Sequence, residues 1–330
     1  MKFGPVPLPD ALGATLAHSM VGAAGRVPKG TVLTQAHLAD LSAQGYDTLV
    51  VARLGPEDVE ENAAAHRLAQ AIAPDAAAQG LRISAAGAGR VNLFADTPGI
   101  VSIDTAAVTT LNTVDPMITL ATVPPFHRVD AGTMVGTIKI IAYGVDAAHL
   151  DTACAAAARA VSVLPPRYRT ATLIETQVGE TVLPIKGRAA LTGRLDRMGM
   201  TLTPRVLVGH QTAPLADAIA AAPGEVVFVL TASATSDPHD VAPEGLRAAG
   251  GSVTAYGMPV DPGNLLFFGD LGPKPVIGLP GCARSPALNG ADWVLERLIC
   301  GVELTQEDIS AMGVGGLLKE IPTRPRPRNA

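Results

Sequence analysis

The segment 231–244, TASATSDPHDVAPE, brings hydroxyl and carboxylate side chains together where an apolar run gives way to a helix-like stretch. At the start of a helix that follows a buried strand, backbone N–H groups and the helix dipole both favour an anion. The hydroxyls in this segment belong to Thr231, Ser233, Thr235 and Ser236. The segment therefore predicts a loop that binds an anionic ligand.

Two carboxylates, Asp237 and Asp240, stand among those donors. A carboxylate repels a phosphate, so its presence indicates a second task, such as holding a metal ion or an amine of the ligand. The alternative is that one of the two merely caps the helix that follows. His239 beside Asp240 suggests an acid–base pair, although neighbours in sequence often point apart.

Two further segments carry charged residues at the ends of predicted strands. Arg284 follows a turn at Gly281 and has the fork of donors that clamps a phosphate, with a surface ion pair as the alternative. Ser285 would cap the last helix or point at the phosphate, and Cys282 would touch a metal or be an inert packed thiol. Lys186 and Arg188 open a helix, where cations oppose the dipole and an anionic ligand would explain them.

After residue 169, predicted strands and helices alternate regularly, and these elements must position the residues named above. Strands are predicted at 171–175, 203–208, 226–230, 252–256, 265–268 and 275–279, and helices at 186–198, 213–222, 244–249 and 289–300. Such alternation predicts an α/β fold with a doubly wound, mostly parallel sheet and helices on both faces. Ligands of such sheets bind at the carboxyl ends of the strands, which would gather the loops 176–186, 231–240 and 280–285.

The first half of the chain predicts a β-rich α+β region. Short strands are expected at 101–103, 118–122 and 134–141, and long helices at 57–73 and 146–163. Pro165 and Pro166 end the second helix and mark the domain boundary. The predicted organisation is an N-terminal region 1–165, an α/β domain 166–310 and a tail 311–330.

Composition excludes several classes of protein. The 330 residues are 48% hydrophobic and 17% charged, which is typical of folded domains, and the net charge of −5 disfavours nucleic acid as a partner. No apolar run is long enough to span a membrane, and the N-terminus lacks the apolar core of a signal peptide. Three cysteines without a CxxC pair fit a reducing compartment without structural zinc. We therefore expect a cytoplasmic protein that binds neither nucleic acid nor membrane.

The loop 231–244 together with the segment 279–285, LPGCARS, resembles the molybdopterin-binding fold of molybdenum-cofactor biosynthesis. The family loop reads TGG followed by P-x-D-V-T-P-E, and Asp240 falls on its acid. Gly281 and Ser285 match the family's LPG-N-P-x-S loop, whereas Cys282 and Ala283 replace its Asn and Pro. Ala232 and Ser233 stand where the family has two glycines. With these side chains, the backbone approaches a ligand less closely than it does with glycine.

Motifs outside these loops resemble the molybdopterin-binding region that is often fused to a molybdenum-cofactor cytidylyltransferase. They are the segments 16–19, 29–34, 139–141, 260–266, 289–295 and 312–318. The nucleotidyltransferase loop itself is absent from the sequence. The resemblance implies Asp240 as the candidate catalytic or amine-binding residue. It implies a ligand site formed by Thr231, Ser233, Thr235, Asp237, Gly281, Arg284, Ser285 and Lys186, with Glu180 as a further candidate near the family's first acidic loop.

The function that the resemblance implies is binding of molybdopterin or the molybdenum cofactor during biosynthesis, maturation or hand-off. Mg²⁺ and a nucleotide are further candidate ligands, and a separate cytidylyltransferase or a molybdoenzyme is the candidate protein partner. Family members are often oligomers, so a homo-oligomer is expected. Two alternatives stay open: an enzyme that adenylates molybdopterin or inserts molybdenum, and a non-catalytic oligomeric scaffold for a molybdoenzyme.

Overall fold

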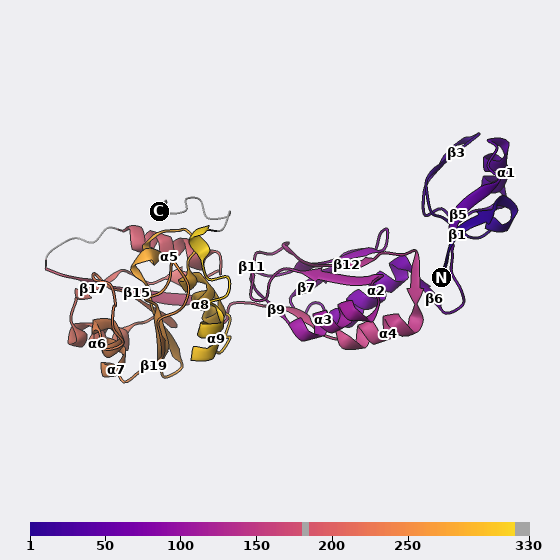
Figure 1. Ribbon diagram of the computed structural model, residues 1–330. Coiled ribbons are helices and arrows are strands. Elements are labelled where there is room, and N and C mark those ends of the chain that lie inside the picture. Colours follow the sequence, from indigo (N-terminus) through magenta and orange to yellow (C-terminus); the bar gives the residue numbers. More distant parts are fainter. Residues whose placement is uncertain (180–184, 321–330) are drawn as a thin grey trace. The chain divides into compact units, whose positions relative to one another are not determined.

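The computed structural model describes residues 1–179 and 185–320, which form two compact units. The first unit contains Met1–Thr97 and Val101–Val163, and the second contains Pro98–Ile100 and the chain from Leu164 onward. The sequence-based boundary at residue 165 lies close to this division. Figure 1 follows the chain through both units.

The first unit begins with a small antiparallel sheet of order β1-β5-β2, formed by β1 (Lys2–Pro7), β5 (Thr48–Arg53) and β2 (Thr15–Leu16). The hairpin β3 (Met20–Gly22) and β4 (Gly25–Val27), the 3-10 turn η1 (Leu8–Ala11) and helix α1 (Gln35–Ala43) complete this part. Thr34 caps α1 by accepting from the His37 backbone N–H. Leu16, Leu41 and Val51 lie in its aliphatic core.

The remainder of the first unit is a four-stranded antiparallel sheet covered by helices. The sheet order is β10-β12-β8-β7, from Ile118–Thr122, Met134–Ile140, Arg90–Ala95 and Leu81–Ile83. The helices are α2 (Glu61–Ile72), α3 (Thr105–Val114) and α4 (Ala147–Ala156). Shorter strands are β6 (Asp58–Glu60), β9 (Gly99–Ile103), β11 (Arg128–Val129), β13 (Gly144–Asp146) and β14 (Val161–Leu164). Leu68, Ile138 and Leu150 are among the fully buried residues of the core.

Both long helices predicted in this region are shorter than expected. The segment predicted as the first turn of 57–73 is the strand β6, and Glu60 instead caps α2 by accepting from the backbone of Asn62 and Ala63. The predicted helix 146–163 ends at Ala156, because Arg159 adopts a left-handed φ of 59° and the alternating segment after it forms β14. Helix α3 was not predicted.

The second unit contains a twisted sheet of order β16-β15-β18-β21-β20-β19, with β17 also pairing with β15. The strands are Thr201–Leu202, Thr170–Gln177, Val226–Leu230, Lys274–Gly278, Phe267–Leu271, Ser252–Tyr256 and, for β17, Val206–Gly209. The pairs among β15, β16, β17, β18 and β21 are parallel, whereas β20 is antiparallel to both neighbours. This confirms the predicted α/β fold with a mostly parallel sheet.

Helices lie on both sides of this sheet (Figure 1). Helices α6 (Thr212–Ala221) and α7 (Val241–Ala248) pack Leu215, Ile219 and Leu246 against Ile174 and Val229. Side chains alternate along a strand, so Glu175 and Leu230 point to the opposite face, where α5 (Lys186–Asp196) begins. The remaining elements are η2 (Gly281–Arg284), α8 (Gly290–Ile299), α9 (Gln306–Ala311) and η3 (Leu318–Glu320).

The first part of the predicted tail packs against the second unit. Met312 and Leu318 are 6% and 2% exposed, and the Leu318 N–H donates to the Asp261 carbonyl at 2.9 Å. Residues 311–319 therefore extend the fold, and the arginine-rich end of the predicted tail lies outside the described residues.

Candidate functional site

The carboxyl ends of β15 and β18 bring three chain segments together. The Ala232 N–H donates to Thr176 Oγ1 at 2.8 Å, which joins the ends of the two strands. Arg284 Nη2 donates to the Thr231 carbonyl at 2.7 Å, which joins η2 to the end of β18. A Cβ on Gly187 would lie 3.3 Å from Arg284 Nη1, so the first turn of α5 is also adjacent. The two described ends of the loop 176–186 thus lie beside the loops 231–240 and 280–285, as the sheet topology predicted.

The hydroxyls of the loop after β18 mostly hold the loop itself. Thr231 Oγ1 donates to the Ser233 carbonyl at 2.6 Å and lies 3.3 Å from Thr235 Oγ1, and both threonines are 7% exposed. The Tyr256 hydroxyl donates to the Thr235 carbonyl at 3.0 Å. Ser233, in contrast, is an exposed residue. Of the three predicted donors, Ser233 is therefore the one that faces solvent.

Asp240 is the N-cap of α7. Its Oδ1 accepts from the Val241 N–H at 2.7 Å and its Oδ2 from the Ser236 N–H at 3.0 Å. The capping interpretation therefore describes the observed contacts. A carboxylate offers about four acceptor positions, so each oxygen keeps capacity for a ligand donor.

The side chains of Asp237 and His239 have partners other than the Asp240 carboxylate. Asp237 Oδ1 accepts from the His239 N–H at 2.8 Å. The His239 ring places Nδ1 2.9 Å from Glu244 Oε1, so the acid–base pair suggested between His239 and Asp240 is not formed. The His239 hydrogen bond, followed by Arg247, lowers the pKa of Glu244. Burial, followed by the charges of Asp237 and Asp240, raises the pKa of Tyr256.

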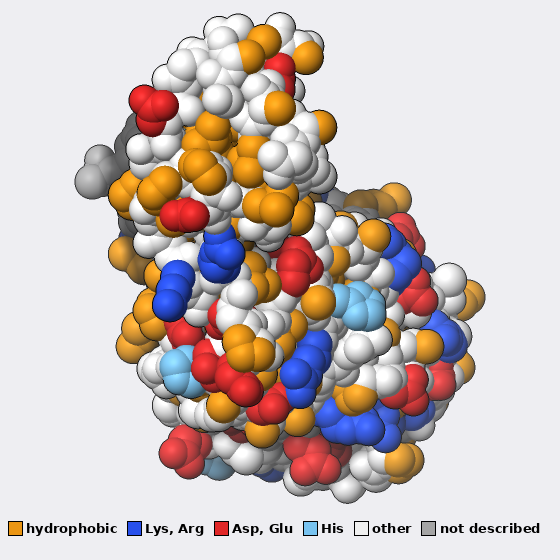
Figure 2. Space-filling model, turned by 90° about the vertical axis from the view of Figure 1, so that its right-hand side faces the viewer, with side chains coloured by type: hydrophobic (Ala, Val, Ile, Leu, Met, Phe, Trp, Pro, Cys, Tyr) orange, Lys and Arg blue, Asp and Glu red, His pale blue; other side chains and the backbone are white. Residues whose placement is uncertain are grey.

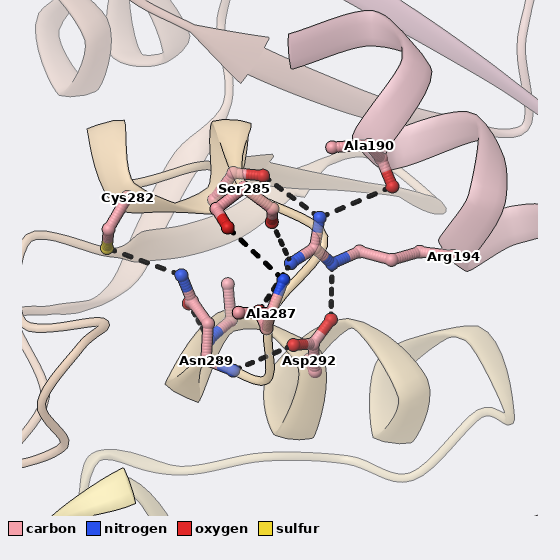
Figure 3. A network of polar contacts seen from close by, with 9 residues as sticks. Ala190, Arg194, Cys282, Ser285, Ala287, Asn289 and Asp292 are labelled. Atoms are coloured by element: carbon pink, nitrogen blue, oxygen red, sulfur yellow. Dashed lines mark hydrogen bonds and ion pairs between the residues drawn. The ribbon is translucent and has the colours of Figure 1, made fainter. Parts of the chain in front are cut away.

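The segment 281–287 is held by one buried arginine. Arg194 on α5 is 4% exposed, and its Nε pairs with Asp292 on α8 (Figure 3). Its two Nη atoms donate to the backbone carbonyls of Ala190, Ala283, Ser285 and Ala287. The guanidinium therefore fixes the path of the chain on both sides of Ser285.

Asn289 ties the same segment to the start of α8. Its Oδ1 accepts from the Ala291 N–H, its backbone N–H donates to Asp292, and its Nδ2 donates to Cys282 Sγ at 3.3 Å (Figure 3). The predicted cap of the last helix by Ser285 is wrong, because Asn289 is the N-cap and Ser285 Oγ accepts from the Ala287 N–H at 3.3 Å. Asn289 with Asp292 three residues later is a capping-box pattern that the sequence analysis missed.

The remaining predicted residues have fewer contacts. Gly281 is the exposed first residue of η2, and a side chain there would meet open space. Lys186 is the exposed first residue of α5, whose N-cap Ile185 has no capping side chain. Glu180 lies outside the described residues.

A buried charged group that was not predicted from the sequence also lies at this edge. Glu175 on β15 is fully buried, and its Oε2 accepts from Arg205 Nε at 2.6 Å. The available signal was a carboxylate directly after Leu173 and Ile174 inside a predicted strand, because isolated buried charges are costly.

Within residues 1–179 and 185–320, no group of three or more His, Cys, Asp or Glu side chains could hold a metal ion. The carboxylates of the loop after β18 bind backbone N–H groups instead. The donor set of the described residues therefore does not fit an all-protein Mg²⁺ site. No helix in this part of the chain is long and apolar enough to cross a membrane.

Charges of both signs lie on the face of the molecule that Figure 2 draws. On the face drawn in Figure 2, Lys and Arg side chains are interspersed with Asp and Glu side chains. That face offers no continuous basic stripe of the kind that binds a phosphate backbone.

Comparisons with known proteins found similar solved structures. No protein-family model matches the chain, and no curated protein matches it. The molybdopterin biosynthesis MoeA protein from Pyrococcus horikosii is 14% identical with a TM-score of 0.31, over 92% of this chain and 76% of that chain. A MogA structure is 22% identical with a TM-score of 0.27, over 39% of this chain and 92% of that chain.

Proposed function

We propose that the second unit binds molybdopterin or the molybdenum cofactor, in biosynthesis, maturation or hand-off of that cofactor. The observation that carries the proposal is the hydrogen bond from Arg284 to the Thr231 carbonyl. It joins the two segments whose sequences resemble the ligand loops of the molybdopterin-binding family. Two motifs that are far apart in the sequence thus border the carboxyl edge of the sheet, where ligands of such folds bind.

The anionic end of the ligand would be held by Arg284 and the loop after β18. A guanidinium has five N–H donors, and the bond to Thr231 uses one nitrogen of the fork. Its remaining donors suit a phosphate, for which arginine has matching geometry. Ser233, an exposed residue of the loop, would add a hydroxyl donor.

The polar edge of the ligand would contact Asp240. The backbone bonds of Asp240 fix both carboxylate oxygens at the start of α7. A carboxylate that is held in place loses less conformational freedom when it accepts an amine of the ligand. This role needs no metal ion.

The test is anaerobic fluorescence titration of molybdopterin into wild-type protein and into Arg284→Gln and Asp240→Asn. Loss of a charged hydrogen bond should weaken binding by about tenfold or more, corresponding to roughly 1.5–3 kcal/mol. Arg197→Gln is the matched control, because Arg197 is exposed at the other end of α5. Absence of binding to the wild type, or equal binding by all four proteins, would refute the proposal.

A turnover assay separates the binding role from the catalytic alternatives. The loop carries Ala232 and Ser233 in place of two glycines, so we expect no efficient consumption of ATP in the presence of molybdopterin. Rapid formation of adenylated molybdopterin would replace the binding role by an adenylyltransferase. Capture of a molybdoenzyme without any pterin binding would instead favour the scaffold.

A further inference from the structure

Glu175 is an incompletely paired charge in the interior of the second unit. It is fully buried near the end of β15, and its ion pair with Arg205 uses Oε2 alone. Oε1 is buried and has no hydrogen-bond partner among the described residues. A buried acceptor without a partner costs free energy, and such groups in native proteins are few. The second oxygen therefore suggests a partner that arrives from outside the chain.

A second unmatched group lies on the adjacent helix. Arg188, in the first turn of α5, donates through Nη2 to the Thr203 carbonyl at 2.5 Å, while its Nη1 is buried and has no partner within residues 1–179 and 185–320. Thr203 is two residues before Arg205, which pairs with Glu175. The same edge of the unit thus holds an acceptor and a donor that do not satisfy each other.

Both groups adjoin the proposed ligand site. Glu175 is the register partner of Leu230, the residue before Thr231, so their side chains share one face of the sheet. On that face, a Cβ on Gly187 would lie 2.6 Å from Leu230 Cδ2 and 3.3 Å from Arg284 Nη1. Arg188 follows Gly187 directly. The unmatched acceptor and donor therefore lie beside the strand end that Arg284 contacts.

We propose that Glu175 recognises the guanidine-like N–H edge of a pterin ring and that Arg188 binds the ring's carbonyl oxygen; this inference rests on the proposed function. The 2-amino group and N3–H of a pterin present two parallel donors, as an arginine does, and a carboxylate accepts such a pair in bidentate fashion. Arg205, whose side chain is 24% exposed, is the outer member of the present ion pair. The ligand would displace it from Glu175 and use both carboxylate oxygens.

The test compares two probes, pterin and lumazine, by fluorescence titration below the pH at which either ring ionises. Lumazine carries a carbonyl in place of the 2-amino group, so it removes one donor and faces Glu175 with an acceptor. We expect wild-type protein to prefer pterin by about tenfold or more. Glu175→Gln should remove most of that preference, because a side-chain amide accepts through one oxygen only.

Glu225→Gln is the matched control, since Glu225 binds the backbone N–H groups of Arg169 and Thr170 at the opposite end of β15. Its preference for pterin should equal that of the wild type. Arg188→Gln is the second variant and should weaken both probes equally, because both carry the 4-carbonyl. Arg188→Gln also tests the proposal if thermal unfolding shows that Glu175→Gln does not fold.

The outcomes separate this inference from the proposed function. Tight molybdopterin binding with no preference between pterin and lumazine would overturn the role of Glu175 and leave the proposed function intact. Preference retained in Glu175→Gln, or an unequal effect of Arg188→Gln, would overturn it as well. Failure of the wild type to bind either molybdopterin or pterin would refute both.

Discussion

The two units differ in what they bury. Among the residues that the structure describes, Gln79 is the buried polar residue of the first unit, and the other buried polar or charged residues, including Glu175, Arg194 and Asp292, belong to the second. Gln79 donates to the carbonyls of Ile72 and Val161, so it satisfies backbone groups inside an aliphatic core. Buried charges are costly unless paired, so their concentration in the second unit marks the part of the molecule where folding alone does not explain the sequence.

The largest expected effect concerns the buried arginine of the second unit. Arg194→Met should destabilise that unit by about 3–5 kcal/mol, because it leaves Asp292 buried without its counter-charge and releases four carbonyls. The measurement is the free energy of unfolding in urea.

The matched variant in the first unit is Arg67→Met. Arg67 and Asp151 form an ion pair whose side chains are 49% and 57% exposed, and such pairs contribute about 0–1 kcal/mol. Similar losses in Arg194→Met and Arg67→Met would show that the buried network is not what holds the segment 281–287.

The alkaline stability of the protein should depend on Cys300. Burial raises the pKa of this thiol from 9.0 to about 12. The unfolded chain ionises first, so stability is fully present below pH 9 and is lost as pH rises toward 12. This linkage corresponds to roughly 2 kcal/mol in the middle of that interval, as an upper estimate.

Cys300→Ala should flatten the alkaline arm of a plot of unfolding free energy against pH. Cys154 in the first unit is the comparison, because burial raises its pKa too, but the thiol is less enclosed. A steeper arm in Cys300→Ala than in the wild type would contradict the assignment.

The sheet of the second unit could be predicted from the sequence, but the ion pairs of that unit could not. The run 226–230 is apolar throughout and forms β18 with the predicted bounds, as does the segment 252–256 for β19. The local pattern gave a wrong helix end in the segment 146–163. Its Ala-rich periodicity predicted one long helix, whereas the observed helix ends at Ala156.

The candidate site shows the same division. The loop after β18 could be predicted from its hydroxyls and acids, because strand ends and turn residues are local signals. The contacts that shape the site are long-range: Arg284 with Thr231, Arg194 with Asp292, and Glu175 with Arg205. Because the partners are far apart in the sequence, local patterns do not reveal such pairs, and the one local signal for Glu175 is a charge next to Leu173 and Ile174 in a strand.

The smallest expected effect distinguishes two helix caps of the same chemistry. Asp240 caps α7 in the second unit, and Asp104 caps α3 in the first by accepting from the Ala107 N–H at 2.9 Å. Replacing either by alanine should cost about 1 kcal/mol of stability, the usual value for an N-cap carboxylate. Thermal unfolding of Asp240→Ala and Asp104→Ala measures this directly.

The two variants should then differ in ligand binding alone. If Asp240 only caps α7, both proteins bind molybdopterin as the wild type does. If Asp240 also accepts an amine of the ligand, Asp240→Ala weakens binding by about tenfold while Asp104→Ala leaves it unchanged. Because the stability cost is matched between the variants, a difference in affinity would not follow from the loss of stability as such. It would assign the second task that the position of Asp240 among anion-binding donors predicted.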